Sequence, residues 1–391
     1  MNIVNEARSL LKANIREYGM YIALFVIMLT FSILTDGLFM SSRNISNLID
    51  ATGYIAVLAV GMTLVIVIRH IDLSVGFASG FLGAIAAILL TQAGAPVYLT
   101  IPIILVLGVG IGLINGFLVA QVGIPAFVAT LAGMLFFRGA LLQVTEKTGT
   151  IIIKNDHFNA IGNGFIPAIA KVHGMNLLSL IIGGLIIAAY IFGELSKRRN
   201  KLKYKFEVIS KSMFSIKLVF VSFIIAYITW ILANYNGFSW TVIIVLIVVA
   251  IYHVLTTSTV LGRHIYAVGS NPEAANLSGI SVKKITYFVF ASMGLLTGLS
   301  GILFTARLQS ATTTAGTLFE LDAIAAAFVG GVSAAGGVGK VTGSIIGAIV
   351  MSSLSNGMNL MGVGISYQYM IRGLVLAAAV IFDVATRKKR G

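Results

Sequence analysis

Three polar residues lie close together where two apolar stretches of the chain meet: Arg69, His70 and Asp72. At this spacing a guanidinium and a carboxylate could form a gate within a bilayer, and the imidazole could relay a proton. The same residues also fit a tight turn at the membrane surface, in which Asp72 caps the helix that follows. The turn is the simpler interpretation of these three side chains. Asp72 nevertheless stays a candidate for lining or gating a pathway.

A glycine-rich run at residues 329–341 resembles a phosphate-binding loop at first sight. Such a loop needs the pattern G-x-x-x-x-G-K-[ST]. Here Gly339 and Lys340 are followed by Val341, so no hydroxyl is placed to meet Mg²⁺, and Ala334 stands where the first glycine belongs. The pattern argues against nucleotide binding and favours close-packed backbone that could line a cavity near a membrane.

The remaining reactive side chains are scattered. The 5 histidines form no cluster, and the sequence contains no cysteine, which excludes disulfides and thiol chemistry. Asn115 and Asn356 lie within apolar stretches, where an amide can line a solute pathway or can simply join two helices by a hydrogen bond. We therefore expect no catalytic residue, no cofactor site and no metal site on this chain.

Composition places these residues in a membrane protein. The chain has 391 residues, of which 58% are hydrophobic and 10% charged, whereas soluble domains carry roughly 25% charged residues. We predict an all-α fold, a single polytopic bundle over residues 1–391 with about 10–12 spans and both termini in the cytoplasm. Five G-x-x-x-G motifs, at Gly76, Gly112, Gly294, Gly339 and Gly343, predict close helix contacts, most simply within one subunit.

Hydropathy predicts twelve candidate spans. They cover residues 20–35, 53–68, 73–91, 99–120, 124–144, 176–193, 218–233, 240–257, 285–306, 323–338, 341–360 and 368–383. Segment 323–338 ends in glycines and is the candidate that could re-enter rather than cross. The spans form two hydrophobic halves, 20–193 and 218–383, joined by a basic loop at 194–217.

Charge sets the expected orientation. The net charge of +14 comes largely from segments such as 196–205 and 387–390 that flank apolar spans. Loops 92–98, 234–239 and 361–367 carry no charge, and the long loop 145–175 carries charges of both signs. Positive loops stay in the cytoplasm, so 194–217 and both termini are expected there. This distribution points to a lipid bilayer as the partner and away from nucleic acid.

One short, well-capped helix stands apart from the spans. Asn271 is suited to the N-cap, Pro272 to the first helical position, Glu273 to the first turn and Gly279 to the stop. About two turns of helix in the cytoplasm would present a handle to a soluble partner. The expected contact residues are Gly269, Ser270, Asn271, Pro272, Glu273, Ala274, Ala275, Asn276, Ser278 and Gly279.

The polar and charged groups within the spans discriminate between classes of membrane transport protein. A channel needs a selectivity filter or a charged ring, and an ion-coupled transporter usually buries several carboxylates, and neither pattern stands out. A transporter that takes its energy from an ATPase through the capped helix fits best. A proton-coupled secondary sugar transporter is the alternative, and a non-transporting scaffold is a third possibility.

The sequence resembles a known family over nearly its full length, the bacterial ATP-binding-cassette sugar importer permeases of the ribose/xylose/galactose branch. The segments that carry the resemblance are GMTLV at 61–65, IDLSVG at 71–76, LAGM at 131–134 with RG at 138–139, GRHIYAVGSN at 262–271 with AA at 274–275 and SGI at 278–280, and GG at 330–331 with GGVG at 336–339. ELDAIAA at 320–326, NGM at 356–358 and the basic insert are most similar to xylose or multiple-monosaccharide permeases.

The resemblance implies a multi-pass permease subunit of the bacterial inner membrane that moves a monosaccharide, and xylose or a related sugar is the expected substrate. It also implies a second copy of the chain, an extracytoplasmic sugar-binding protein, and a cytoplasmic ATPase subunit with two fused ATPase domains that binds the ATP and Mg²⁺. Residues 269–280 would then be the element that touches the ATPase.

Overall fold

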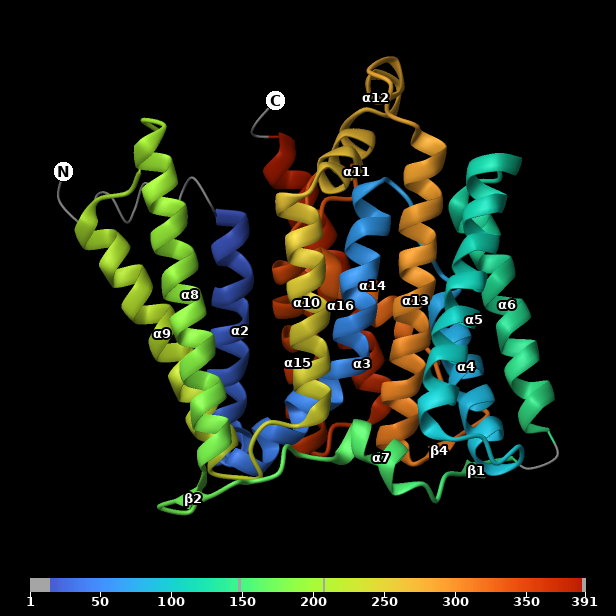
Figure 1. The fold of residues 1–391 in the computed structure, drawn as a ribbon, viewed down its shortest axis with the longest axis horizontal. Helices are drawn as coiled ribbons and strands as arrows, with labels where there is room; N and C mark the ends of the chain where they lie inside the picture. Colours follow the sequence, from blue (N-terminus) through green and yellow to red (C-terminus); the bar gives the residue numbers. More distant parts are fainter. Residues whose placement is uncertain (1–14, 147–148, 207, 389–391) are drawn as a thin grey trace.

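The structure, a computed structural model, describes residues 15–146, 149–206 and 208–388. Most of the described chain is a bundle of helices that run side by side across one slab (Figure 1). The helices of the slab are α2 (Ile15–Leu34), α3 (Ser42–Val67), α4 (Val75–Thr91), α5 (Val97–Phe117), α6 (Ala126–Thr145), α8 (Leu177–Lys203), α9 (Lys211–Ala233), α10 (Trp240–Ser258), α13 (Val282–Leu308), α14 (Phe319–Val329), α15 (Val341–Leu360) and α16 (Ile365–Lys388).

Short elements cap the two ends of the slab. At one end lie α11 (Val260–Ser270) and α12 (Pro272–Leu277), and we call this the α12 end (Figure 1). At the other, the β1 end, lie α7 (Asp156–Asn163) and the strand pairs β1–β4 (Ile151–Ile152 with Ser310–Ala311) and β2–β3 (Lys171–Val172 with Met175–Asn176), all antiparallel. The 3₁₀ helix η1 (Leu38–Met40) and the π-helix η2 (Leu118–Val122) complete the described elements.

The predicted helical membrane fold is confirmed, since every predicted span coincides with a helix of the slab. In the described residues, 9 helices are long and apolar enough to cross a membrane, and two shorter apolar helices, at Gly19–Leu34 and Val75–Thr91, accompany them. The termini lie partly outside the described residues, including the basic positions 389 and 390, so their predicted orientation stays a prediction.

Three predicted boundaries are wrong. Helix α3 begins at Ser42, 11 residues before the predicted start of its span at 53. The segment 194–217 is not one loop, because α8 continues to Lys203 and α9 already begins at Lys211. Lysine and arginine are good helix formers, and their long side chains allow a helix to continue past the membrane surface into water. The segment 323–338 is helical only as far as Val329, and turns occupy the rest of it because Gly331, Gly336 and Gly337 all adopt positive φ angles.

The protein core is built on α3 and α13. Nearly every residue of α3 from Ile55 to Val67 is buried, whereas α8, α9 and α16 expose most of their apolar side chains. A helix that is apolar on all sides and buried within the protein has no face left for lipid, so α3 and α13 form the interior and the outer helices meet the bilayer.

Glycine contacts bring these helices close together. A Cβ atom on Gly108 of α5 would overlap the carbonyl oxygen of Gly294 on α13, and one on Gly294 would overlap Gly108 in return. Gly76 of α4 lies against Gly316, and Gly347 of α15 lies against α14 in the same way. These motifs therefore pack helices within one chain, as the sequence predicts.

Two helices, α4 and α14, begin halfway through the slab. Ser79 of α4 lies against Gly301 of α13, and Gly301 lies 7 residues, about 10 Å, before α13 ends at the β1 end. The start of α4 is 4 residues further from that end, so it lies about 16 Å deep along a helix about 40 Å long. Because Gly316, three residues before α14, packs on Gly76, α14 starts at a similar depth.

The glycine contact between α5 and α13 can be tested by a matched pair of substitutions. We expect Gly108→Val to destabilise the folded protein by about 1–3 kcal/mol or more, because two backbones would have to separate. Gly110→Val, also on α5, should change stability by less than about 0.5 kcal/mol, because a Cβ atom there meets nothing within 4 Å. Thermal unfolding in detergent, followed by size-exclusion chromatography, measures both. Equal losses would contradict the packing role of Gly108.

Candidate functional site

Helices α11 and α12 lie together at the α12 end, and we call the two helices the handle. Helix α12 is the short capped helix that the sequence predicts. The Asn271 side-chain oxygen accepts a hydrogen bond from the Ala274 N–H at 3.0 Å, Pro272 occupies the first turn, and Gly279 has φ +82° just after the helix. The sequence prediction of this capped helix is confirmed. Leu277 at its last position is 89% exposed, so an apolar side chain projects from the protein where the helix ends.

The handle rests on the core through α11. Ile265 and Val268, one turn apart, are buried in the same cluster as the residues of α3 and α13. Gly269 allows the closest approach, because a Cβ atom there would overlap the carbonyl oxygen of Val67 at the end of α3. Only a glycine can take this position without separating α11 from α3.

Arg69 fastens the handle to α3. Its Nε donates to the Gly269 carbonyl at 2.7 Å, and its Nη2 donates to the Ser270 carbonyl. These are the last carbonyls of α11, which lack helical partners and carry the negative end of the helix dipole. The sequence suggested that Arg69 could pair with Asp72, but the structure turns the guanidinium to the handle instead.

The glycine-rich run joins the handle from the other side. The Gly337 N–H donates to the Val67 carbonyl at 2.8 Å, and the Tyr266 hydroxyl donates to the Gly339 carbonyl at 2.6 Å. Burial raises the pKa of Tyr266, so the phenol stays protonated and able to donate. The close-packed backbone predicted for 329–341 is therefore a connection between α14 and α11.

Asp72 and Asn115 meet in the non-helical link between α3 and α4. The Asp72 carboxylate accepts from the Ser74 N–H at 2.9 Å and from the Ser74 hydroxyl at 2.6 Å. Asn115 of α5 donates to the Ser74 hydroxyl at 2.9 Å. All three side chains are buried. They hold Ser74, the N-cap residue of α4, in place. The predicted surface turn with Asp72 as the helix cap is therefore wrong, because the link lies deep in the slab and Ser74 precedes the helix, while the pathway role of Asp72 stays a prediction.

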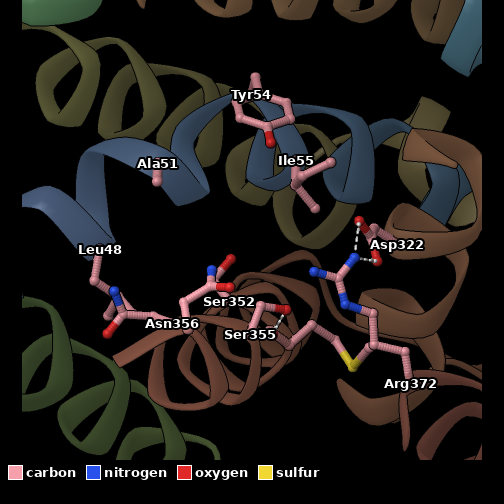
Figure 2. A pocket seen from close by; sticks show the side chains of 11 residues that line it. Leu48, Ala51, Tyr54, Ile55, Asp322, Ser352, Ser355, Asn356 and Arg372 are labelled. Atoms are coloured by element: carbon pink, nitrogen blue, oxygen red, sulfur yellow. Dashed lines mark hydrogen bonds and ion pairs between the residues drawn. The ribbon is translucent and has the colours of Figure 1, made fainter. Parts of the chain in front are cut away.

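A polar cavity of about 220 Å³ lies between α3, α14, α15 and α16 (Figure 2). Its polar lining comes from Tyr54, Asp322, Ser352, Ser355, Asn356, Asn359 and Arg372. At about 30 Å³ for each water in the liquid, this volume corresponds to roughly seven water molecules. The cavity is partly open, and its volume suits a small polar molecule and lies below the about 300–1,000 Å³ that is typical of drug-sized ligands.

An ion pair spans the cavity from α14 to α16. Arg372 Nη1 lies 3.4 Å from Asp322 Oδ1 and 3.3 Å from Oδ2, and each side chain is 23% exposed (Figure 2). Asn356 lines the same cavity and exchanges hydrogen bonds with Asn44 at 2.9 and 3.1 Å. Both interpretations of Asn356 from the sequence are thus compatible with its position.

Sequence reasoning missed three parts of this site. It left Arg69 without its carbonyl partners, gave Tyr266 no role, and did not single out Asp322 and Arg372. A signal existed for the last two, because a carboxylate and a guanidinium beside apolar spans are costly unless they pair. The ten predicted handle residues do lie together, while Asp72, Asn115 and Asn356 form two separate groups.

Comparison with known proteins gives the site its context. The profile of the family described as "Branched-chain amino acid transport system / permease component" matches residues 44–380. The xylose transport system permease protein XylH of Haemophilus influenzae is 39% identical over 376 residues, which cover 96% of this chain and 98% of that protein. XylH of Escherichia coli K12 is 38% identical over 96% of this chain and 93% of its own length.

A second group of relatives is more distant. The ribose import permease protein RbsC of Haemophilus influenzae is 34% identical over 370 residues, which cover 94% of this chain and 93% of that protein. No solved structure matches the chain.

The attachment of the handle through Arg69 predicts a measurable change in local stability. Arg69→Gln should raise the amide hydrogen-exchange rate of residues 269–280 roughly tenfold or more, because a hydrogen bond to a charged group contributes about 1.5–3 kcal/mol. Arg69→Lys should restore part of the protection, since an ammonium keeps the charge but lacks the planar fork. Arg263→Gln, which changes an exposed arginine of α11, serves as the control. Unchanged exchange in Arg69→Gln would contradict the attachment.

Proposed function

The chain belongs to the family of permease components of branched-chain amino acid transport systems, and from this premise we propose that it is the membrane permease of an ATP-driven importer for a monosaccharide. It is a multi-pass inner-membrane protein and a transport subunit, not an enzyme. The xylose permeases among its relatives, at 38–39% identity over nearly the whole chain, make xylose or a related pentose the proposed substrate.

The observation that carries the proposal is the exposed handle and its attachment to the interior. The two-turn helix α12 exposes Leu277 at its end and buries Ala275 in the core, and it follows directly on α11. The end of α11 is bonded to the end of α3 by Arg69, and Tyr266 of α11 is bonded to the turns after α14. A soluble partner that moves α12 would therefore move the ends of two interior helices. This is the coupling that a transport subunit needs when it carries no energy source of its own.

The partners follow from the class of the permease. An importer of this class works with an ATPase and a substrate-binding protein. We propose that the ATPase subunit contains two fused ATPase domains, binds the ATP and Mg²⁺, and contacts residues 269–280. We also propose that two copies of the chain form the complete pathway, with the sugar-binding protein docked at the β1 end.

The sidedness of the proposal rests on charge. Basic residues on the described part of the α12 end include Lys197, Arg199, Arg263, Lys283 and Lys284, whereas loops 92–98, 234–239 and 361–367 at the β1 end carry no charge. Positive charge is retained in the cytoplasm. The α12 end therefore faces the ATPase side, and the polar cavity lies in the half of the membrane nearer the β1 end, where the sugar arrives.

A proton-coupled secondary transporter is the alternative mechanism, and the family membership does not favour it. The proposal instead has two arrangements of the bundle exchange as the ATPase dimer closes and opens. The differential contacts of the ATPase with α12 in the two states would supply the free energy for this exchange.

The proposed sidedness can be tested directly because the sequence has no cysteine. A cysteine introduced by Leu277→Cys should react with a membrane-impermeant maleimide only in inside-out vesicles. Ile169→Cys, 79% exposed at the β1 end, should react only in intact spheroplasts. The reverse pattern would place the handle outside and would refute both the sidedness and the proposed ATPase contact.

Contact with the ATPase predicts the effect of a charge at the tip of the handle. Leu277→Arg should abolish co-purification of the ATPase and ATP-dependent xylose uptake while leaving thermal stability nearly unchanged, because the side chain is 89% exposed. Leu202→Arg, the same change at an exposed leucine near the end of α8, should retain both activities. Normal uptake by Leu277→Arg would argue against the handle as the coupling element.

A further inference from the structure

We propose that the cavity between α3, α14, α15 and α16 is the compartment in which the permease holds its monosaccharide during passage, and that Asp322 and Arg372 bind the sugar hydroxyls there (Figure 2). This inference rests on the proposed function, because it assigns a site within the transport pathway. It also identifies side chains that no span pattern or sequence motif had connected with the substrate.

The chemistry of the lining matches a polyol. A sugar hydroxyl both donates and accepts, and neighbouring hydroxyls can fit the two oxygens of a carboxylate or the two nitrogens of a guanidinium. Asp322 offers acceptors, Arg372 offers donors, and Asn356 and Ser355 offer both. Tyr54 also lines the cavity, and its ring packs on Phe304 and Phe319 with centroids 5.0 and 4.7 Å away.

The ion pair has hydrogen-bonding capacity left to give to a ligand. A closed arginine–carboxylate pair has two parallel bonds of about 2.7–2.9 Å. Here one nitrogen of Arg372 reaches both oxygens of Asp322 at 3.3 and 3.4 Å, and the buried Nε of Arg372 has no hydrogen-bond partner in the part of the chain that the structure describes. A pair in this geometry can exchange part of its contact for hydroxyl groups without leaving either charge unpaired.

The charges of Asp322 and Arg372 also have a high desolvation free energy at this depth in the membrane. A carboxylate and a guanidinium at membrane depth cost several kcal/mol each in desolvation, and a pair of well-packed apolar residues is often at least as stable. Intramembrane charges that face a cavity therefore mark substrate pathways more often than they mark structural locks. The polar groups beside them, from Ser352 to Asn359 on α15, extend the same hydrophilic surface.

The cavity is connected to the handle through one rigid element. Asp322 lies in the first turn of α14, and the last residue of α14, Val329, leads into the turns that bind Val67 and Tyr266. A displacement of the handle would therefore shift Asp322 relative to Arg372, which belongs to a different helix. The sugar site would change as the ATPase moves α12, which is the behaviour required for release into the cell.

The first test fills the cavity without touching its charges. Ala51→Leu adds volume to the lining on α3, and it should lower uptake of radiolabelled xylose by cells carrying the complete importer roughly tenfold or more, by competing for the space of the sugar. Ala250→Leu, the same change at an exposed position of α10, should leave uptake unchanged. Equal uptake by the Ala51→Leu and wild-type proteins, with both at normal abundance, would overturn the proposal.

The second test separates sugar binding from a structural ion pair. Asp322→Asn and Arg372→Gln should each lower uptake roughly tenfold or more, because each removes a charged hydrogen bond to the sugar. The double variant D322R/R372D restores a pair of opposite charges, so it should recover thermal stability and capture of the ATPase, but not uptake. Recovery of uptake in the double variant would show that the pair only holds α14 against α16 and would overturn the proposal.

The experiment also distinguishes the two levels of inference. If the wild-type importer takes up no labelled xylose or ribose, and ATPase capture does not depend on Leu277, the proposed function itself fails. If the wild type transports sugar and captures the ATPase through Leu277 while the cavity variants behave like the wild type, only the assignment of the cavity fails.

Discussion

A membrane-embedded backbone must satisfy its own hydrogen bonds, because hydrocarbon offers no water to do so. Most of this chain meets that constraint with uninterrupted helices. Two stretches, residues 68–74 and 312–318, break the helical pattern at depth, and the first is bonded by a neighbouring helix while the second forms a turn of its own. Thr130 of α6 donates to the Ile71 carbonyl at 3.2 Å, and the Ala315 N–H donates to the Thr312 carbonyl at 3.2 Å. The half-length helices α4 and α14 exist because these breaks are protected.

The same constraint explains how the handle and the cavity come to be linked. The turns after α14 cannot be left open, so Gly337 bonds to the end of α3 and Gly339 accepts from Tyr266 of α11. The last carbonyls of α11 would also lack partners, and Arg69 satisfies them. Closing the backbone at the α12 end therefore produces one connected body of α3, α11 and α14. A force on α12 is transmitted through it, because close-packed interiors shift as units instead of deforming gradually.

Glycine residues determine where the helices of the interior can pack closely. At Gly269 and Gly108 the absence of a side chain lets two backbones touch, which no larger residue permits. The outer helices α8 and α9 have few such contacts with the interior and pack mainly on each other. Van der Waals contact between small residues, together with interhelical hydrogen bonds, replaces the hydrophobic effect as the force that holds helices together in lipid. The buried Asn115–Ser74 bond is one example of the second kind.

The sequence by itself determined the helices and the capped handle. Hydropathy and capping are local properties, so the existence of the twelve helices of the slab, the Asn271 cap and the stop at Gly279 were predicted, while several helix ends, such as those of α3, α8 and α14, were not. The partners of distant side chains were decided by the tertiary structure alone. Arg69 meets carbonyls 200 and 201 positions away, and Asp322 meets Arg372 across 50 residues, pairings that no local pattern encodes. They arise because glycine contacts and protected breaks bring those helices together, and the packing energy of the whole bundle sets that arrangement.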